Sequence, residues 1–93
     1  MEARPGFIRG IVAALQQRQE PRYRLVWSFR VERRRADGAV LPPVAVEMRG
    51  IGFEGPIING DEVELEAPSY RPGDVVAAYR VRNLSSNAVV CTR

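Results

Sequence analysis

The strongest constraint on the fold is an alternation of mostly apolar and mostly polar side chains between residues 23 and 33. The odd positions hold Tyr23, Leu25, Trp27, Phe29 and Val31. The even positions hold Arg24, Val26, Ser28, Arg30 and Glu32. Successive residues of a β-strand point to opposite faces, so a period of two predicts a strand with one buried face. We expect the odd-numbered side chains inside and the arginines in water.

Weaker stretches of the same pattern predict further strands. We expect them at residues 7–17, 40–49, 62–66 and 75–83, with a short addition at 88–92. Gly10 interrupts the first strand, which predicts a bend or a close approach of another backbone there. The same glycine weakens the competing prediction of a helix over residues 8–19. An Asp-Gly pair at 37–38 predicts a hairpin turn, and the prolines at 42–43 confine the start of the third strand to an edge or a bulge.

The later strands also predict which side chains are buried. In the third strand the expected inward set is Val44, Val46 and Met48, and the outward set is Ala45, Glu47 and Arg49. In the fourth strand we expect Val63 and Leu65 inside and Glu62, Glu64 and Glu66 outside. Between them, residues 50–60 hold four glycines, too many for a stable helix. We expect a loop there, with Phe53, Ile57 and Ile58 plugging the open end of the core.

Several segments resemble those of OB-fold modules. The stretch Ile8-Arg9-Gly10-Ile11-Val12 resembles their opening strand, and Gly60-Asp61-Glu62-Val63-Glu64-Leu65 resembles the start of their fourth strand. Residues 26–33 and 44–50 resemble an uncharacterised bacterial OB-like accessory module. The resemblance spans roughly residues 6–84, although an SH3-like barrel would show similar glycine spacing.

The resemblance and the strand count together give a definite expectation for the fold. We expect an all-β single domain over residues 1–93, a five-stranded closed or partly open Greek-key β-barrel. OB domains usually carry a helix between the third and fourth strands. Here the glycines predict a short loop or turn instead of a long helix.

Composition argues against catalysis. The chain has no histidine and one cysteine, Cys91, which excludes a multi-ligand zinc site and removes the commonest general base. We therefore expect no enzyme activity, no catalytic residues, no metal and no cofactor. No apolar run approaches the roughly 18 residues that span a bilayer, and the first ten residues do not resemble a signal peptide. These features predict a cytoplasmic protein with no membrane partner.

The charge is unevenly distributed. All 14 basic residues are arginine, and residues 1–49 hold ten of them against five acidic residues. OB modules bind single strands across strands two and three with basic and aromatic side chains. The expected nucleic-acid-binding residues are therefore Arg24, Arg30, Arg33, Arg34, Arg35 and Arg49, with Tyr70 as a stacking residue. The competing interpretation is a solvated face on which Arg30 and Arg49 pair with Glu32 and Glu47 across strands.

Two classes of partner follow. The first hypothesis is a non-enzymatic module that binds single-stranded DNA or RNA through the arginine face. The second is a protein-interaction or self-assembly module that uses an exposed edge strand or opposed charged strips. In that case the acidic strip of Glu62, Glu64 and Glu66 would face the arginines of a second copy.

Overall fold

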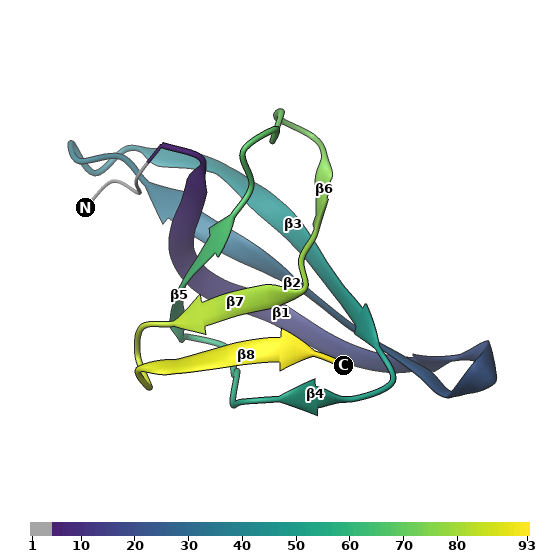
Figure 1. Ribbon diagram of the computed structural model, residues 1–93. Coiled ribbons are helices and arrows are strands. Elements are labelled where there is room, and N and C mark those ends of the chain that lie inside the picture. Colours follow the sequence, from purple (N-terminus) through teal and green to yellow (C-terminus); the bar gives the residue numbers. More distant parts are fainter. Residues whose placement is uncertain (1–4) are drawn as a thin grey trace.

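The computed structural model describes residues 5–93, apart from the side chain of Tyr23, whose expected inward position lies outside the described residues. The described part is all-β, as expected, with one 3₁₀ turn and no α-helix (Figure 1). Its elements are β1 (Phe7–Glu20), η1 (Pro21–Tyr23), β2 (Arg24–Arg34), β3 (Val40–Gly50), β4 (Phe53–Glu54), β5 (Glu62–Glu66), β6 (Val75–Ala77), β7 (Arg80–Asn83) and β8 (Ala88–Thr92).

The strand predictions hold for most of the chain, and the competing helix over residues 8–19 is wrong. Strands β5 and β8 begin and end where the pattern placed them. The count of five is wrong because β4 was not predicted and residues 75–83 form two strands, giving eight in the described residues. That segment changes partner at Ala78, since β6 runs parallel to β3 while β7 pairs antiparallel with β5 and β8.

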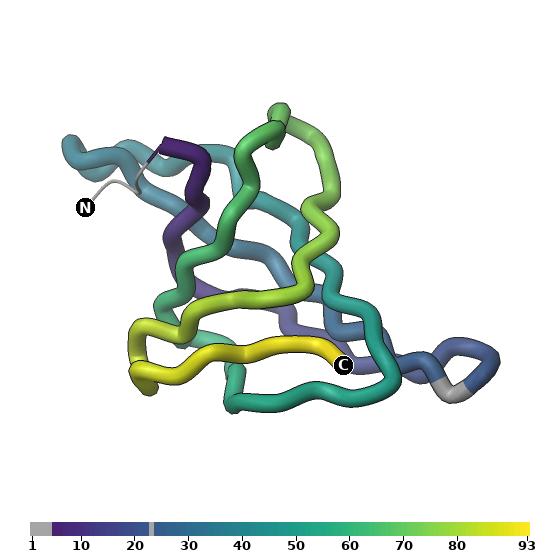
Figure 2. The backbone as a smooth tube through the Cα atoms, in the orientation of Figure 1, coloured from purple at the N-terminus to yellow at the C-terminus, as the bar shows by residue number. Residues whose placement is uncertain are grey.

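The eight strands form one sheet that is not closed. The order is β4-β8-β7-β5-β1-β2-β3-β6, with β4 and β6 at its ends. The sheet nevertheless curls, and two chain segments cross between its two sides: residues 77–80 join β6 to β7, and residues 50–53 join β3 to β4 (Figure 2). Backbone hydrogen bonds fix both crossings: the amide of Ala78 donates to the carbonyl of Glu47, and that of Ile51 donates to the carbonyl of Arg93. The curled sheet thus encloses a core, although no ladder of hydrogen bonds between β4 and β6 closes it.

Strand β1 changes its surroundings halfway along. Residues Phe7–Ile11 pair with β5, whereas Gln16–Glu20 pair with β2 alone. Between these halves a β-bulge sets two residues of β1 against Phe29, and the first of them, Ala14, has a φ of 54°. Such a bulge bends the strand, so the second half leaves the core and forms a projecting hairpin with β2 (Figure 1).

Gly10 marks a close approach, as expected. A Cβ atom at this position would lie 2.2 Å from the carbonyl oxygen of Glu32. The bend itself lies at the bulge, four residues further on. Only a residue without a side chain fits so close to the β2 backbone.

The core lies on the inner face of the curled sheet. It contains Ile8, Val12, Phe29, Val31, Val44, Val46, Met48, Ile57, Val63, Leu65, Ala78, Val81 and Val90. The inward sets predicted for β3 and β5 are confirmed, and Ile57 plugs one end as expected. Ile58 does not, because its side chain is 65% exposed. Glu64 is also a correction, since it is buried rather than outside.

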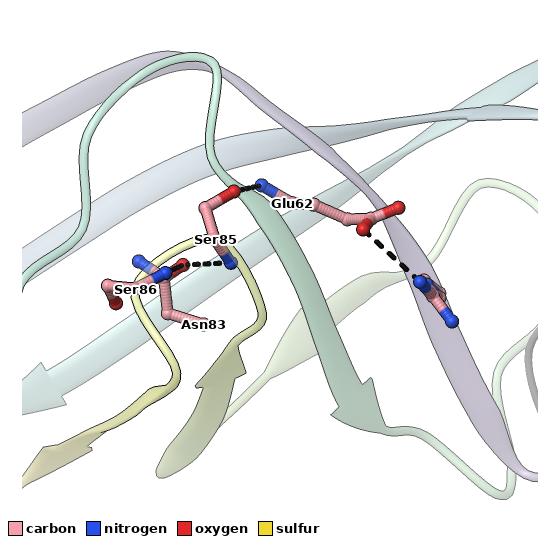
Figure 3. Close-up of polar contacts among 5 residues, drawn as sticks. Glu62, Asn83, Ser85 and Ser86 are labelled. Atoms are coloured by element: carbon pink, nitrogen blue, oxygen red, sulfur yellow. Dashed lines mark hydrogen bonds and ion pairs between the residues drawn. The ribbon is translucent and has the colours of Figure 1, made fainter.

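A buried asparagine fastens the loop before β5 to the turn after β7. Asn83 is fully buried, and its Nδ2 donates to the carbonyl of Pro56 and to Oδ2 of Asp61. Its Oδ1 accepts from the amides of Ser85 and Ser86, and the Ser85 hydroxyl accepts from the amide of Glu62 (Figure 3). All hydrogen-bonding groups of the amide side chain are used, which is what burial of a polar group requires.

Candidate nucleic-acid interface

The outer face of β2 presents two exposed arginines, Arg24 and Arg30. Arg30 pairs across the sheet with Ala13 on β1 and Ala45 on β3. No carboxylate stands directly opposite its guanidinium, because both neighbours are alanines. Among the described residues, neither arginine forms an ion pair.

Beside this row lies a buried valine that the pattern did not predict. Val26 is fully buried although it belongs to the even, outward set of β2, and it lies outside the main core cluster. Its cross-strand neighbours are Arg18 and Arg49. These two arginines and the carboxylates of Glu20 and Glu47 form ion pairs of 3.3–3.8 Å. Long charged side chains cover apolar groups with their stems while the charges stay in water, which accounts for the burial of Val26.

We call Arg18, Glu20, Glu47 and Arg49 the ion-pair quartet. It agrees in part with the competing interpretation, since Arg49 and Glu47 are paired at 3.3 Å, but both lie on β3. The pairs that cross the sheet join them to Glu20 and Arg18 of β1. It does not include Arg30 or Glu32. Part of the expected arginine face is therefore balanced by carboxylates, and the part around Arg30 is not.

The other predicted arginines lie at the far end of β2. Arg35 pairs with Asp37 at 2.8 Å inside the hairpin turn, and Arg34 donates to the carbonyl of Gly38. Arg33 is half-buried and donates to the carbonyl of Pro42. An eleven-residue strand is about 33 Å long, so Arg24 and Arg34 stand at opposite ends of β2. The six arginines do not converge on one groove.

Tyr70 lies beside Arg33 at the hairpin end of β2. The Arg33 guanidinium carbon is 5.8 Å from the centre of the tyrosine ring, and the ring packs against the core. A cation–π contact of this kind orders both side chains. The pair lies at the hairpin end of β2, away from the projecting half of β1.

Near Arg33 a hollow of about 390 Å³ opens beside β1 and β2. It is bordered by Arg9, Gly10, Ile11, Glu32, Arg33, Arg34, Val40 and Glu62. Glu62 pairs with Arg9 at 3.2 Å, and Glu32 adds a second carboxylate to the wall. These carboxylates oppose binding of an anion, so this hollow is a weaker candidate than the projecting end.

The projecting end holds an aromatic pair that lies outside the predicted set of binding residues. The rings of Trp27 and Phe53 are stacked, with centroids 4.0 Å apart and planes 2° from parallel. Both are half-buried and border a hollow of about 380 Å³, together with Gln17, Arg18, Gln19 and Leu25. The odd-position pattern placed Trp27 on the inner face correctly. It contained no information on Phe53, which arrives from β4.

The remaining polar groups form no metal-binding cluster in the described residues. No group of three His, Cys, Asp or Glu side chains lies close enough together to hold a metal ion within residues 5–93. The acidic strip on β5 is not free, because Glu62 pairs with Arg9 and Glu64 is buried. Cys91 is a half-buried free thiol with its Sγ 3.8 Å from a carboxylate oxygen of Glu54.

The described residues include no helix with the length and apolar character needed to cross a bilayer. No protein-family model, no curated protein and no solved structure matches the chain.

Proposed function

We propose that this chain is a non-enzymatic, OB-like module that binds single-stranded nucleic acid across the outer face of β2 and β3. The observation that carries the proposal is the exposed Arg30 between two alanines, with Arg24 further along the same face. Glu20 stands opposite Arg24 in the register, but neither guanidinium forms an ion pair with a described residue, so both are available for phosphate oxygens. The short side chains of the neighbouring alanines do not obstruct the surface, so the sugar-phosphate backbone of a nucleic acid can lie across it.

The connection of the strands supports the OB-like part of the proposal. If residues 75–83 are counted as one bent strand, they lie beside β3 at one end and beside β5 at the other. Strand β5 in turn pairs with β1. A circuit of five segments around one core is the OB arrangement, in which the face of strands two and three and the loop between strands one and two bind oligonucleotides.

The test is binding of a fluorescently labelled single strand, measured by anisotropy at two salt concentrations. Phosphate contacts make single-strand affinity fall with salt, by about 0.7 in the log–log slope for each phosphate neutralised. Arg24→Ala with Arg30→Ala should weaken binding roughly 10-fold at low salt and reduce the slope by about 1.4.

A matched control removes the same charge elsewhere. Arg71 and Arg80 are exposed, stand outside β2 and β3, and form no ion pair with described residues. Arg71→Ala with Arg80→Ala should leave the slope almost unchanged. Equal effects of the two double variants would show that only net charge matters, and the proposal would then be wrong.

A second candidate function is protein interaction through the edge of β1. The backbone of Gln16–Glu20 is paired with β2 on one side only, and an open edge is a template for an added strand. Light scattering over a range of concentrations tests self-assembly through this edge. A monomer at all concentrations, together with salt-dependent strand binding, favours the first proposal.

A further inference from the structure

The hollow beside the Trp27–Phe53 stack lies on the opposite side of β2 from Arg24 and Arg30, so the arginine face does not explain it. Trp27 is an odd, inward residue of β2, but the sheet projects past the core at this point. Its ring is therefore only half-buried and borders the hollow, as does the ring of Phe53. Binding sites for small planar ligands combine such apolar walls with a few polar groups.

The polar groups of this hollow come from β1. Gln17 stands directly opposite Trp27, and Gln19 directly opposite Leu25. Residues paired in this way share one face of the sheet, so two amides lie beside two apolar side chains. Side-chain amides carry a donor and an acceptor side by side, which suits the edge of a nucleobase. The aromatic rings suit its face, because every base has a π surface.

The charge around the hollow favours an anionic polymer. Residues 16–24 carry three arginines, Arg18, Arg22 and Arg24, against Glu20 as the one acid. Arg18 borders the hollow and also belongs to the ion-pair quartet, where its contacts are 3.8 Å long and exposed. Exposed ion pairs of this length are weak, so a phosphate can replace the carboxylates as its partner.

We propose that this hollow binds one nucleobase of a single strand, a proposal that rests on the function proposed above. The base stacks on the Trp27–Phe53 pair, and Gln17 and Gln19 hydrogen-bond to its edge. The bound oligonucleotide reaches the hollow from the arginine face by crossing the open edge of β1 at Arg18. A single oligonucleotide thus contacts both faces of the projecting hairpin.

The test uses the fluorescence of Trp27, which is the single tryptophan of the chain. A short single strand is titrated into the protein and compared with an abasic strand of equal length and charge. We expect the strand with bases to quench the tryptophan emission and the abasic strand to leave it unchanged. Anisotropy of labelled copies of both strands is measured in parallel, because it reports phosphate binding without the base.

Variants of the amides separate the hollow from the core. Gln17 and Gln19 are exposed, so Gln17→Ala with Gln19→Ala should fold normally and bind the strand with bases on the order of 10-fold more weakly. Their effect on the abasic strand should be negligible. Gln16→Ala is the matched control, since Gln16 is also exposed but pairs with Ser28 on the outer face.

The results distinguish the two proposals. Binding of both strands with unchanged tryptophan emission would overturn the base site and leave the arginine face intact. Unaltered affinity of the double glutamine variant would do the same. No binding of either strand at low salt would overturn both proposals. Equal quenching by a neutral oligosaccharide would overturn the assignment of the hollow to a nucleobase.

Discussion

The two halves of β1 differ in what surrounds them. The first half is paired with β5 over Phe7–Ile11 and carries Ile8 and Val12 into the core. The second half, Gln16–Glu20, is paired with β2 alone and has no residue in the core. The same strand therefore serves as scaffold at one end and as an open surface at the other. The β-bulge therefore separates a half of the strand that is packed in the fold from a half that is available for the proposed binding.

An alanine substitution in each half of β1 tests this difference, and the largest effect on stability is expected in the first half. Gly10→Ala puts a Cβ 2.2 Å from the Glu32 carbonyl and 2.8 Å from a Val31 methyl. Since one of these atoms is backbone, the β1 and β2 strands must separate, and we expect a loss of more than about 3 kcal/mol in the free energy of unfolding. Urea denaturation measures it.

The partner substitution is Gln17→Ala in the second half. Because this side chain is exposed, the free energy of unfolding should change by less than about 0.5 kcal/mol. Comparable losses for the two substitutions would mean that both halves of β1 belong to the scaffold.

The next largest effect is expected at Asn83, which binds the loop before β5 and so supports the first half of β1 through that loop. Loop residues 59–61 bind to β1 beyond the end of β5, through the amide of Gly60 and the side chain of Asn59. Asn83→Ala removes four hydrogen bonds and leaves Asp61 without its asparagine partner. We expect a loss of about 2–4 kcal/mol, measured by thermal or urea unfolding.

A control for this prediction is Asn87→Ala, an exposed change in the same turn with a φ of 55° at that residue. Asparagine tolerates this conformation better than alanine, so a loss of about 1 kcal/mol is expected. If Asn83→Ala cost no more than this, the amide would not be holding the loop.

A smaller effect separates two buried valines, one in the core and one under the ion-pair quartet. Both Val46 and Val26 are almost fully buried. Val46→Ala leaves a cavity among packed side chains and should cost about 2–3 kcal/mol. Val26→Ala should cost about 1 kcal/mol, because flexible charged side chains above it can collapse. Equal losses, measured by urea denaturation, would place Val26 in the core.

The smallest effect on stability is expected within the quartet itself. Glu47→Gln removes the carboxylate that pairs with both Arg18 and Arg49. Exposed ion pairs contribute little, so stability should change by less than about 1 kcal/mol. Affinity for a single strand should rise roughly 2- to 5-fold at low salt, because two arginines gain freedom to bind phosphate. An unchanged or lower affinity would mean that the arginines of the ion-pair quartet do not contribute to binding of the single strand.

The sequence predicted the features that follow from local alternation, namely the strands and their buried faces. It did not predict contacts between residues that are far apart in the sequence. Phe29 and Val31 were placed inside correctly, because each strand has one face toward the core. Val26 was assigned to the outer face of β2 with the polar residues. Its burial was not predicted, because the side chains that cover it come from β1 and β3. The change of partner at Ala78 is fixed by a hydrogen bond to Glu47, 31 positions away, which no local pattern reports.

The same reason explains what was missed at the site. Arg24 and Arg30 of β2 were identified from the alternation. Pairing of Arg49 with Glu47 was anticipated, but the contribution of Arg18 and Glu20 from β1 was not. Phe53 was expected to plug the core with Ile57 and Ile58. Its ring does pack against the core, but it also stacks on Trp27 at the edge of the hollow, a contact that the pattern did not predict. Alternation predicts the face on which a side chain lies. It does not predict where a strand extends beyond the core.

The most direct test of the account is an amide chemical-shift map of the protein titrated with an unlabelled single strand. We predict shifts concentrated in residues 16–30, in the neighbouring part of β3 and around Phe53, with residues 7–11 and β7 unchanged. Shifts concentrated instead on β5, β7 and β8, or spread evenly over both halves of β1, would contradict the division of this strand into a scaffold half and a binding half.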